Sequence, residues 1–401
     1  MDGPTIVDRS GALEATLDSG AAPASGPQSQ TSTTRTTVLP RVEWTGDAPK
    51  LVATSRPRFE SRGSLGEGGV GEVVSAFDQD IGRDVAIKRL RPEVQGPAAT
   101  ARFIDEIHTV GSLEHPNIVP IHDVGVDESG ALYFVMRRVN GQTLESIIEK
   151  LAAGDPLAHA HWTFERRAHL FRQILDAVAF AHERGIVHRD IKPANVMVGH
   201  FGEVFLMDWG IAKPIAGPDH ALPRLDAAPQ PERVTATHVG AIVGTPFYMS
   251  PEQARGEKVD VRSDVYSLCV MFHELLTLRH YLEHCKTMDE VIQGAQHVRH
   301  PAPYATPKHA HQAPVPADLM WFVLKGVAKD PAERYQSVGE MITRLDARDD
   351  GQIPIQCHVT FTKSLTRRAL RWVDRHPAAF SAGLAVGTLA AIGAVVWRLL
   401  V

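Results

Sequence analysis

Apolar and polar positions divide the chain into segments with different periods. From Phe59 to about Leu345 apolar residues recur continuously, first at every second position and then at a spacing near 3.6. The first spacing is typical of strands and the second of helices. This pattern predicts one folded body over residues 58–346, in which strands precede helices.

The first 57 residues show neither period. They are rich in Ser, Thr, Gly, Ala and Pro, most densely between Ser19 and Thr37. Such a segment has too little apolar surface to offset the entropy that it loses on ordering. We therefore expect residues 1–57 to be a disordered, Ser/Thr-rich region, and their start lacks the basic and apolar parts of a signal peptide.

The C-terminal part changes from basic to apolar. Residues 347–377 predict a basic juxtamembrane linker, whose cations are Lys363, Arg367, Arg368, Arg371 and Arg375. Residues 378–397 carry no charge, and about 20 helical residues span about 30 Å, the hydrocarbon thickness of a bilayer. We interpret residues 378–397 as a transmembrane helix; the alternative, a buried core helix, would need a partner domain, and the chain ends four residues later.

The basic residues are distributed unevenly about this span. Several precede it and only Arg398 follows it. Because basic residues are enriched on the cytoplasmic side of membrane spans, we expect a single-pass protein of the cell membrane with its folded body in the cytoplasm. The sequence leaves open whether the protein is tail-anchored or is a longer receptor cut short.

Composition argues against several classes of partner and cofactor. Lys and Arg number 42 and Asp and Glu 47, for a formal net charge of −5, which does not favour a nucleic-acid partner. Cys269, Cys285 and Cys357 are far apart in the sequence. They indicate neither a disulfide framework nor a thiolate zinc site, which favours a reducing compartment for the body of the protein.

A glycine-rich motif, GEGGVG at 66–71, matches the pattern GxGxxG. Dinucleotide-binding folds share this spelling, but there a helix follows the last glycine, whereas here a β-prone run follows. A Walker A loop is excluded because Glu72 follows Gly71. A glycine turn between strands lets backbone amides approach phosphate oxygens, and Lys88 on the next strand can reach the same phosphates.

A second motif, HRDIKPAN at 188–195, follows a helical segment that ends near Gly185. Asp190 can accept the proton of a substrate hydroxyl, and Lys192 can steady a transferred phosphoryl group. Asn195 offers an uncharged oxygen to a metal ion. A short apolar strand then leads to Asp208 in the sequence DWG.

Together these motifs resemble those of the protein kinase family, specifically the bacterial, membrane-anchored Ser/Thr kinases of eukaryotic type. GxGxxG, VAIK at 85–88, HRDxKxxN and DWG occur in family order, and SPE at 250–252 stands where the family has APE. The resemblance covers Phe59 to Leu345. It implies an α+β, two-lobed kinase fold, with an antiparallel sheet and one helix in the N-terminal lobe and a mainly helical C-terminal lobe, followed here by the transmembrane helix.

The implied activity is transfer of the ATP γ-phosphoryl group to Ser or Thr hydroxyls of proteins, by a membrane-anchored signalling enzyme activated by autophosphorylation. Lys192 follows Asp190 by two residues, as in the Ser/Thr branch of the family. The alternative is a pseudokinase that binds nucleotide and acts as a scaffold at the membrane. The implied cofactors are ATP and Mg²⁺, with Mn²⁺ as a substitute.

The resemblance also assigns site residues. Glu106 is expected to pair with Lys88, ahead of Asp105, because it lies nine residues before His115 as in the family. Asn195 and Asp208 are expected to bind the metal ion. The catalytic set is Lys88, Asp190, Lys192 and Asn195. The nucleotide-binding set is Gly66, Gly68, Gly71, Val73, Ala86, Lys88, Glu106, Met136 and Val139.

Departures from the family pattern are few. Trp209 replaces the phenylalanine of DFG, and another aromatic ring can pack in the same place. Met136 is the expected gatekeeper, and Arg137 follows it where an acidic residue is common. Adenine is recognised there through main-chain groups, so ATP binding should be unaffected. Arg334 is the expected partner of Glu252.

The activation segment, residues 208–252, has a Pro/Ala-rich middle that we interpret as a flexible insertion. Thr235 and Thr237 lie after it and are the candidate phosphorylation sites. A phosphate there could pair with Arg189, beside Asp190, and order the segment.

Small residues recur every four positions in the expected transmembrane helix, at Ala379, Gly383, Gly387 and Ala391. Such a stripe lets two helices approach closely and favours self-association. The Ala- and Gly-rich composition of this segment is the competing explanation.

Overall fold

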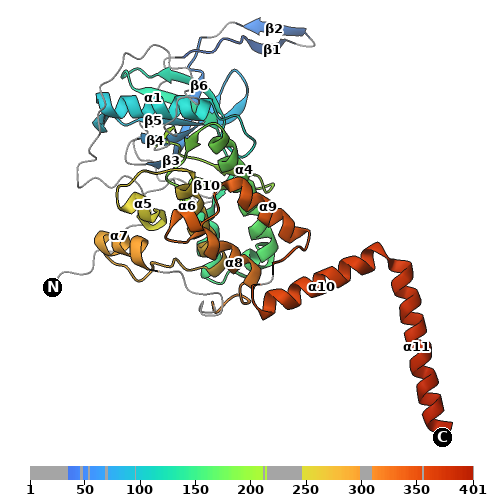
Figure 1. The fold of residues 1–401 in the computed structure, drawn as a ribbon. Helices are drawn as coiled ribbons and strands as arrows, with labels where there is room; N and C mark the ends of the chain where they lie inside the picture. Colours follow the sequence, from blue (N-terminus) through green and yellow to red (C-terminus); the bar gives the residue numbers. More distant parts are fainter. Residues whose placement is uncertain are drawn as a thin grey trace.

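The body of the chain consists of a sheet lobe and a helical lobe (Figure 1). The computed structural model describes residues 35–45, 48–52, 55–67, 71–94, 96–210, 213–214, 246–298, 309–354 and 356–400. The sheet lobe comes first in the chain and the helical lobe follows it, as the change of period predicts. This arrangement confirms the α+β, two-lobed fold expected from the resemblance.

The sheet lobe contains a five-stranded antiparallel sheet with the strand order β3-β4-β5-β7-β6. Its strands are β3 (Phe59–Glu67), β4 (Gly71–Asp78), β5 (Arg83–Leu90), β6 (Ile121–Val126) and β7 (Leu132–Arg137). Side chains alternate between the two faces. In β5, Val85 and Ile87 pack with Tyr133 on one face, so Lys88 points to the opposite face.

Helix α1 (Pro97–Gly111) belongs to the sheet lobe, with the short η1 (Pro92–Val94) before it. Its buried residues, Phe103, Glu106 and Val110, are spaced as on one face of a helix. Phe103 packs on Phe134 of β7 with ring centroids 5.4 Å apart. Glu106 is therefore on the side of α1 that meets the sheet.

Two long helices, α4 (Phe164–Glu183) and α6 (Val261–Thr277), form the centre of the helical lobe. Every residue of α6 from Ser263 to Thr277 is buried, and Phe171 stacks on Phe272 with ring centroids 4.0 Å apart. Shorter helices surround them: α2 (Leu144–Ala152), α3 (Pro156–His161), α5 (Pro251–Ala254), α7 (Met288–His297), α8 (Ala317–Gly326) and α9 (Val338–Asp349).

Short strands line the junction between the lobes. They are β8 (Gly141–Thr143), β9 (Ile186–Val187), β10 (Val196–Gly199), β11 (Val204–Leu206) and β12 (Lys213–Pro214), with the 3-10 turn η2 (Pro193–Asn195). The 3-10 turns η3 (Pro246–Tyr248) and η4 (Pro331–Glu333) belong to the helical lobe. Strand β10 pairs with both β8 and β11. This small sheet carries the loops of the site described below.

Two segments differ from the sequence prediction. Residues expected to be disordered form an exposed hairpin of β1 (Arg41–Thr45) and β2 (Ala48–Val52), in which Trp44 opposes Pro49. Its β-branched and aromatic residues favour strands although the hairpin buries almost nothing. The expected linker of residues 347–377 contains a complete helix, α10 (His358–Arg375), because its residues have helical amphipathic spacing.

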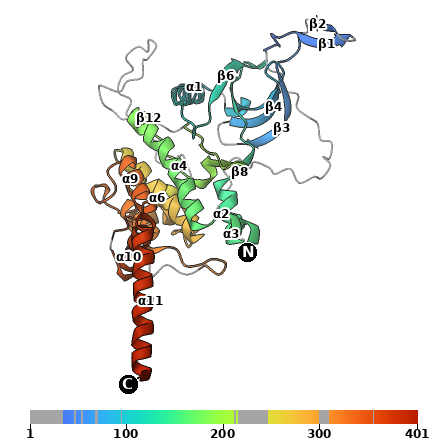
Figure 2. The ribbon, with the colours of Figure 1, turned by 90° about the vertical axis from the view of Figure 1, so that its right-hand side faces the viewer.

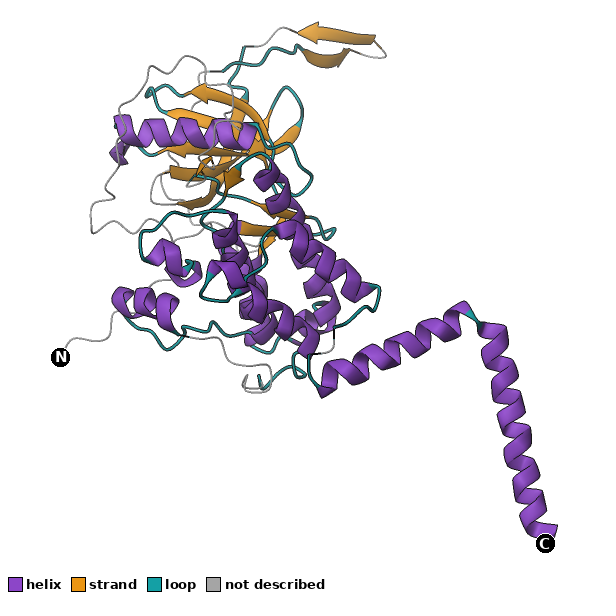
Figure 3. Ribbon diagram, viewed as in Figure 1, coloured by secondary structure: helices purple, strands orange, loops and turns teal. Residues whose placement is uncertain are grey.

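Helix α11 (Pro377–Leu400) follows α10 and extends away from both lobes (Figures 2 and 3). Within the described part of the chain, one helix is long and apolar enough to cross a membrane: 21 residues from Pro377 to Trp397, with a mean hydropathy of 2.0. None of that window is buried against the rest of the chain.

A buried ion pair fixes α5 to the end of the helical lobe. Arg334 donates to both carboxylate oxygens of Glu252, at 2.7 and 2.8 Å, and Ser263 donates to the same carboxylate at 2.5 Å. Burial alone would raise the pKa of Glu252, but these hydrogen bonds outweigh it and lower the pKa to about 2. This is the partner of Glu252 expected from the sequence.

We predict that Arg334→Met lowers the free energy of unfolding by about 3–5 kcal/mol, because it leaves the Glu252 carboxylate buried without its cation. The loss should be measured by urea denaturation at neutral pH. The matched control is Arg255→Ala, which removes an exposed pair with Glu257 and should cost about 0–1 kcal/mol.

The pH dependence follows from the lowered pKa of Glu252. A lowered pKa stabilises the fold above the unfolded value of 4.5, and this contribution disappears as the pH falls toward 2. The difference between wild type and Arg334→Met should shrink over that range. Equal, small losses for both variants at neutral pH would contradict a stabilising role for this pair.

Candidate active site

A lysine from the sheet meets two carboxylates at the junction between the lobes. Lys88 Nζ lies 2.5 Å from Glu106 Oε1 and 3.4 Å from Asp208 Oδ1. The three residues come from β5, α1 and the loop after β11. The Lys88–Glu106 contact is the pairing that the sequence register predicts.

Lys88 and Asp208 keep their charges, whereas burial raises the pKa of Glu106 against the opposing effect of the Lys88 cation. Burial alone would lower the pKa of Lys88, but the carboxylates of Asp208 and Glu106 outweigh it and raise the pKa of the lysine. The nearby Lys88 cation lowers the pKa of Asp208 against the effect of burial. The site therefore presents an ammonium group and an ionised carboxylate at neutral pH.

The β10–β11 hairpin brings Asn195 and Asp208 to the same end of a small sheet. Val196 pairs with Leu206 across the hairpin, and Met207 N donates to Asn195 O at 2.9 Å. Asn195 immediately precedes β10, and Asp208 is the second residue after β11. Strand register thus places the two residues side by side.

The loop at 188–195 holds a second polar group. Lys192 Nζ lies 3.1 Å from Asp190 Oδ2. Asn195 Nδ2 donates to Asp190 O at 2.9 Å and to Asp190 Oδ2 at 3.2 Å. Burial raises the pKa of Asp190, although the Lys192 cation opposes this rise.

Asp264 of helix α6 supports this loop through hydrogen bonds, a role that the sequence did not reveal. Its carboxylate accepts hydrogen bonds from the backbone N–H of His188 at 2.8 Å and of Arg189 at 2.9 Å. It also lies 2.7 Å from His182 Nε2. Arg189 has a positive φ of 70°, so the carboxylate holds an unfavourable backbone conformation in place. In the sequence, the sign of such a role is a single carboxylate in the first turn of a mostly apolar helix.

Comparison with known proteins agrees with this geometry. The family model described as protein kinase domain matches residues 59–343. The chain belongs to the protein kinase family. The cluster of Lys88, Glu106 and Asp208 therefore joins the two lobes of a kinase domain.

Curated bacterial proteins resemble the chain over most of its length. It is 36% identical over 299 residues to serine/threonine-protein kinase PknD of Protochlamydia amoebophila and 39% identical over 300 residues to a probable serine/threonine-protein kinase of Streptomyces coelicolor. It is 38% identical over 303 residues to serine/threonine-protein kinase PknB of Mycobacterium tuberculosis. These matches cover 72–74% of this chain but only 30–44% of the relatives.

The kinase domain carries a tryptophan in its DWG motif. Trp209 is 2% exposed and belongs to the core of the helical lobe. Its ring lies 4.5 Å from the ring of His188, centroid to centroid. The larger aromatic side chain is accommodated while Asp208 remains beside Lys88.

Several of the expected nucleotide-binding residues lie on the inner strands β4, β5 and β7 of the five-stranded sheet. Val73 pairs with Lys88, and Ala86 pairs with Met136. Met136 and Val139 pack on a small apolar cluster of Val119, Met197 and Phe205. The three residues of this cluster were not identified from the sequence.

The glycine motif lies partly within the described residues. Gly66 is near the end of β3, and Gly71 begins β4. A Cβ atom on Gly71 would lie 2.7 Å from Arg89 O, so only glycine fits where β4 passes close to β5. Gly68 lies outside the described residues.

Arg137 has its own partners on the kinase surface. It lies 3.7 Å from Glu203 Oε1 and its guanidinium group stacks over Phe205 at 4.7 Å. Its side chain is directed to β11 and its neighbours rather than to the cluster at Lys88. The candidate phosphorylation sites Thr235 and Thr237 lie outside the described residues.

The donor set fits a divalent metal ion with oxygen ligands. Asn195 uses its amide N–H group on Asp190, which leaves its amide oxygen as a ligand. Asp208 supplies an ionised carboxylate on the adjoining strand end. Carboxylate and amide oxygens are the ligands that Mg²⁺ prefers, and the family implies ATP together with a divalent metal.

Proposed function

We propose that the chain is a protein Ser/Thr kinase that transfers the γ-phosphoryl group of ATP to Ser or Thr hydroxyls of proteins. The observation that supports this most strongly is the contact of Lys88 with both Glu106 and Asp208, which closes the sheet lobe onto the helical lobe. Asp190, Lys192 and Asn195 complete the set of polar groups on the facing loop. Every catalytic role therefore has a residue to fill it.

In this proposal Asp190 acts as the proton acceptor. Its Oδ2 already accepts hydrogen bonds from Lys192 and Asn195, so Oδ1 is the oxygen that meets a substrate hydroxyl. The hydroxyl oxygen attacks the γ-phosphorus and its proton passes to Asp190. The bond from the γ-phosphorus to the β–γ bridging oxygen breaks, and ADP leaves with the electron pair.

The cations of the site bind and orient the phosphates. Lys88 holds the phosphates of ATP from the sheet side, and Lys192 contacts the transferred group from the loop side. Asn195 and Asp208 would hold Mg²⁺, with Mn²⁺ as a substitute. A metal ion held by these two residues would neutralise negative charge on the phosphates.

The nucleotide-binding set comes from the sheet lobe and from the residues after β7. Gly66, Gly68 and Gly71 would cover the phosphates with backbone amides. Val73 and Ala86 would contact the adenine ring. Met136 and Val139 would close the inner end of its pocket, with Glu106 holding Lys88 in position.

We also propose that α11 crosses the cell membrane and that the kinase domain lies on its cytoplasmic side. The length and composition of the helix and the basic residues before it support this orientation. In this organisation residues 58–346 are the kinase domain and residues 347–377 are the juxtamembrane segment. Residues 378–397 are the span, and residues 1–57 form an N-terminal region.

Self-association through the span is part of the same proposal. Gly383 and Gly387 lie one helical turn apart and carry no side chain, which allows a second helix to approach closely. Two tethered kinase domains would then phosphorylate each other at high effective concentration.

Arg189 is the group that we propose to sense phosphorylation. Among the described residues, its Nε is buried and has no hydrogen-bond partner. An unsatisfied buried donor next to the catalytic loop is suited to a phosphate on the activation segment. Thr235 and Thr237 are the proposed phosphorylation sites.

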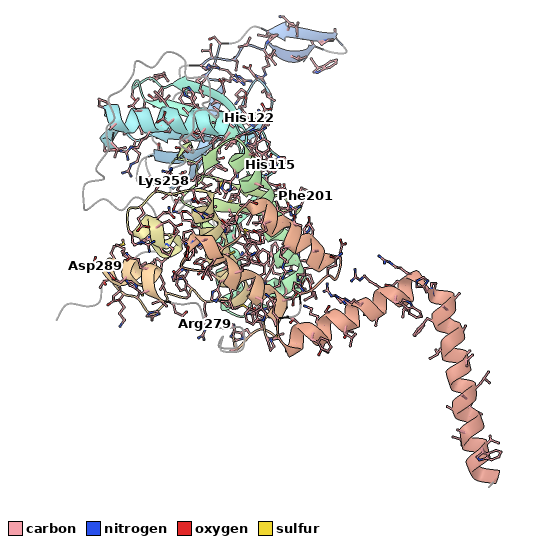
Figure 4. The ribbon with its side chains drawn as sticks, viewed as in Figure 1. His115, His122, Phe201, Lys258, Arg279 and Asp289 are labelled. Atoms are coloured by element: carbon pink, nitrogen blue, oxygen red, sulfur yellow. The ribbon has the colours of Figure 1, made fainter. Side chains whose placement is uncertain are left out.

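We predict that Asp190→Asn lowers kcat by about 10²–10⁴-fold, because it removes the proton acceptor, and leaves ATP affinity near that of wild type. Asp208→Ala should abolish magnesium-dependent transfer. The assay is transfer of labelled phosphate from magnesium ATP to a protein acceptor by the full chain. Asp289→Asn, an exposed carboxylate of α7 labelled in Figure 4, is the control.

The outcomes separate the enzyme from a nucleotide-binding pseudokinase scaffold. Equal turnover by wild type and Asp190→Asn would remove the catalytic assignment. Nucleotide binding without transfer in the wild type would favour the scaffold.

A second prediction concerns activation. Replacing both Thr235 and Thr237 with alanine should lower kcat/KM by roughly tenfold or more, since one charge-assisted contact to phosphate is lost. Arg189→Ala should cause a similar loss alone but almost none in the alanine background, because both changes remove the same contact. Mass spectrometry that finds unmodified Thr235 and Thr237 in fully active enzyme would refute this mechanism.

A further inference from the structure

Helix α10 directs its polar side toward the kinase domain. Lys363 Nζ lies 2.5 Å from Asp318 Oδ1 of α8, and Arg367 Nη1 donates to Arg348 O of α9 at 2.9 Å. Thr360 and Ser364 are buried on the same side. The helix therefore attaches to the kinase domain through polar groups.

The side of α10 opposite Lys363 carries three exposed apolar residues, while Val359 and Leu370 are exposed on other faces of the helix. Phe361 is 51% exposed, Leu365 is 59% exposed and Trp372 is 51% exposed. These residues recur at intervals of four and seven, so they form one stripe along the helix. We call Phe361, Leu365 and Trp372 the apolar stripe. A surface helix of a soluble domain normally has the reverse arrangement, with its apolar face against the core.

A charge network centred on the buried side chains of Asp318 and Arg348 opposes a rotation of α10 that would hide this stripe. Asp318 accepts a hydrogen bond from Arg348 Nε at 2.6 Å as well as from Lys363. Arg348 in turn lies 2.8 Å from Glu165 of α4. The side chains of Asp318 and Arg348 are almost completely buried. Separating Lys363 from Asp318 would leave this carboxylate with less compensation, which is costly in a buried site.

The position of α11 indicates what covers the stripe. Helix α11 begins at Pro377, five residues after Trp372. The two helices meet at a sharp bend, so α10 runs sideways from the start of α11 instead of continuing its axis (Figures 1 and 3). If α11 crosses a bilayer, the 18 residues of α10 lie within about 27 Å of the point of entry. A bilayer surface is then the nearest large apolar phase.

The charges beside the stripe fit that surface. Arg368 and Arg375 are exposed on α10 and stand next to the stripe on the helical wheel. Interfacial helices combine aromatic and aliphatic residues on one side with flanking cations that contact anionic headgroups. Tryptophan in particular is enriched at the membrane interface.

We propose that α10 lies in the interface of an anionic bilayer, with the apolar stripe in the headgroup–acyl boundary. This inference rests on the proposed membrane span of α11. Because α10 is bound to α4, α8 and α9 through the charge network, it holds the kinase domain in a fixed orientation at the membrane. The helix is thus a docking surface and not a flexible tether.

The test uses the full chain reconstituted into vesicles rich in anionic lipid. Cys285 and Cys357 are replaced by serine, while the fully buried Cys269 is retained. A spin label is placed by Leu365→Cys on the stripe, by Leu389→Cys inside α11, or by Phe201→Cys, whose native side chain is 97% exposed on the kinase domain. Collision rates with oxygen and with a water-soluble nickel chelate then report immersion.

We expect the nickel collision rate at position 365 to fall by about threefold or more relative to position 201, since an interfacial label is largely shielded from water. Position 389 should be fully shielded. Shielding at 389 with free nickel access at 365 would overturn the proposal and leave the span intact. Free access at both positions would refute the span and the interfacial helix together.

A second copy of the chain is the competing cover for the stripe. It would shield position 365 independently of anionic lipid and would bring two labels close enough to broaden each other's spectra. That result would also overturn the proposal. As a second variant, Arg368→Glu with Arg375→Glu should restore nickel access at 365 in anionic vesicles, because it replaces attraction to the headgroups with repulsion. Unchanged shielding in this variant would contradict the electrostatic part of the proposal.

Discussion

The contact of the Lys88 ammonium group with two carboxylates is the interaction on which the site depends. Glu106 is supplied by the helix that packs on the sheet, and Asp208 by the loop after the β10–β11 hairpin. One cation therefore joins three elements from both lobes. Loss of any of its partners would leave a buried charge with less compensation, which is strongly unfavourable. The proposed ATP site exists only while this cluster is closed.

The facing loop is held by a different carboxylate. Asp264, in the buried helix α6, accepts the backbone N–H groups of His188 and Arg189. The loop therefore rests on α6, a helix whose residues from Ser263 to Thr277 are all buried, and its unusual backbone at Arg189 is fixed from the core. Rigid support from one helix and charge pairing across the lobes together position Asp190, Asn195 and Asp208 for phosphoryl transfer.

The sequence predicted the parts of the structure that depend on local order. Alternation in β5 places Lys88 opposite Val85 and Ile87, and helical spacing in α1 places Glu106 with Phe103 on the buried face. The support from Asp264 could not be predicted, because the hydrogen bonds that its carboxylate accepts come from residues about 75 positions away in the sequence. The inverted polarity of α10 was also missed: its amphipathic pattern is visible in the sequence, but which side faces the protein depends on Asp318 and Arg348.

The most direct test is a double-mutant cycle on Lys88→Met and Glu106→Gln, read as kcat/KM for phosphoryl transfer from magnesium ATP. If Glu106 acts by holding Lys88, the double variant should be little worse than Lys88→Met alone, with a coupling energy of about 1–3 kcal/mol. Losses that simply add would mean that the two residues act independently. That result would contradict the claim that this contact assembles the active site.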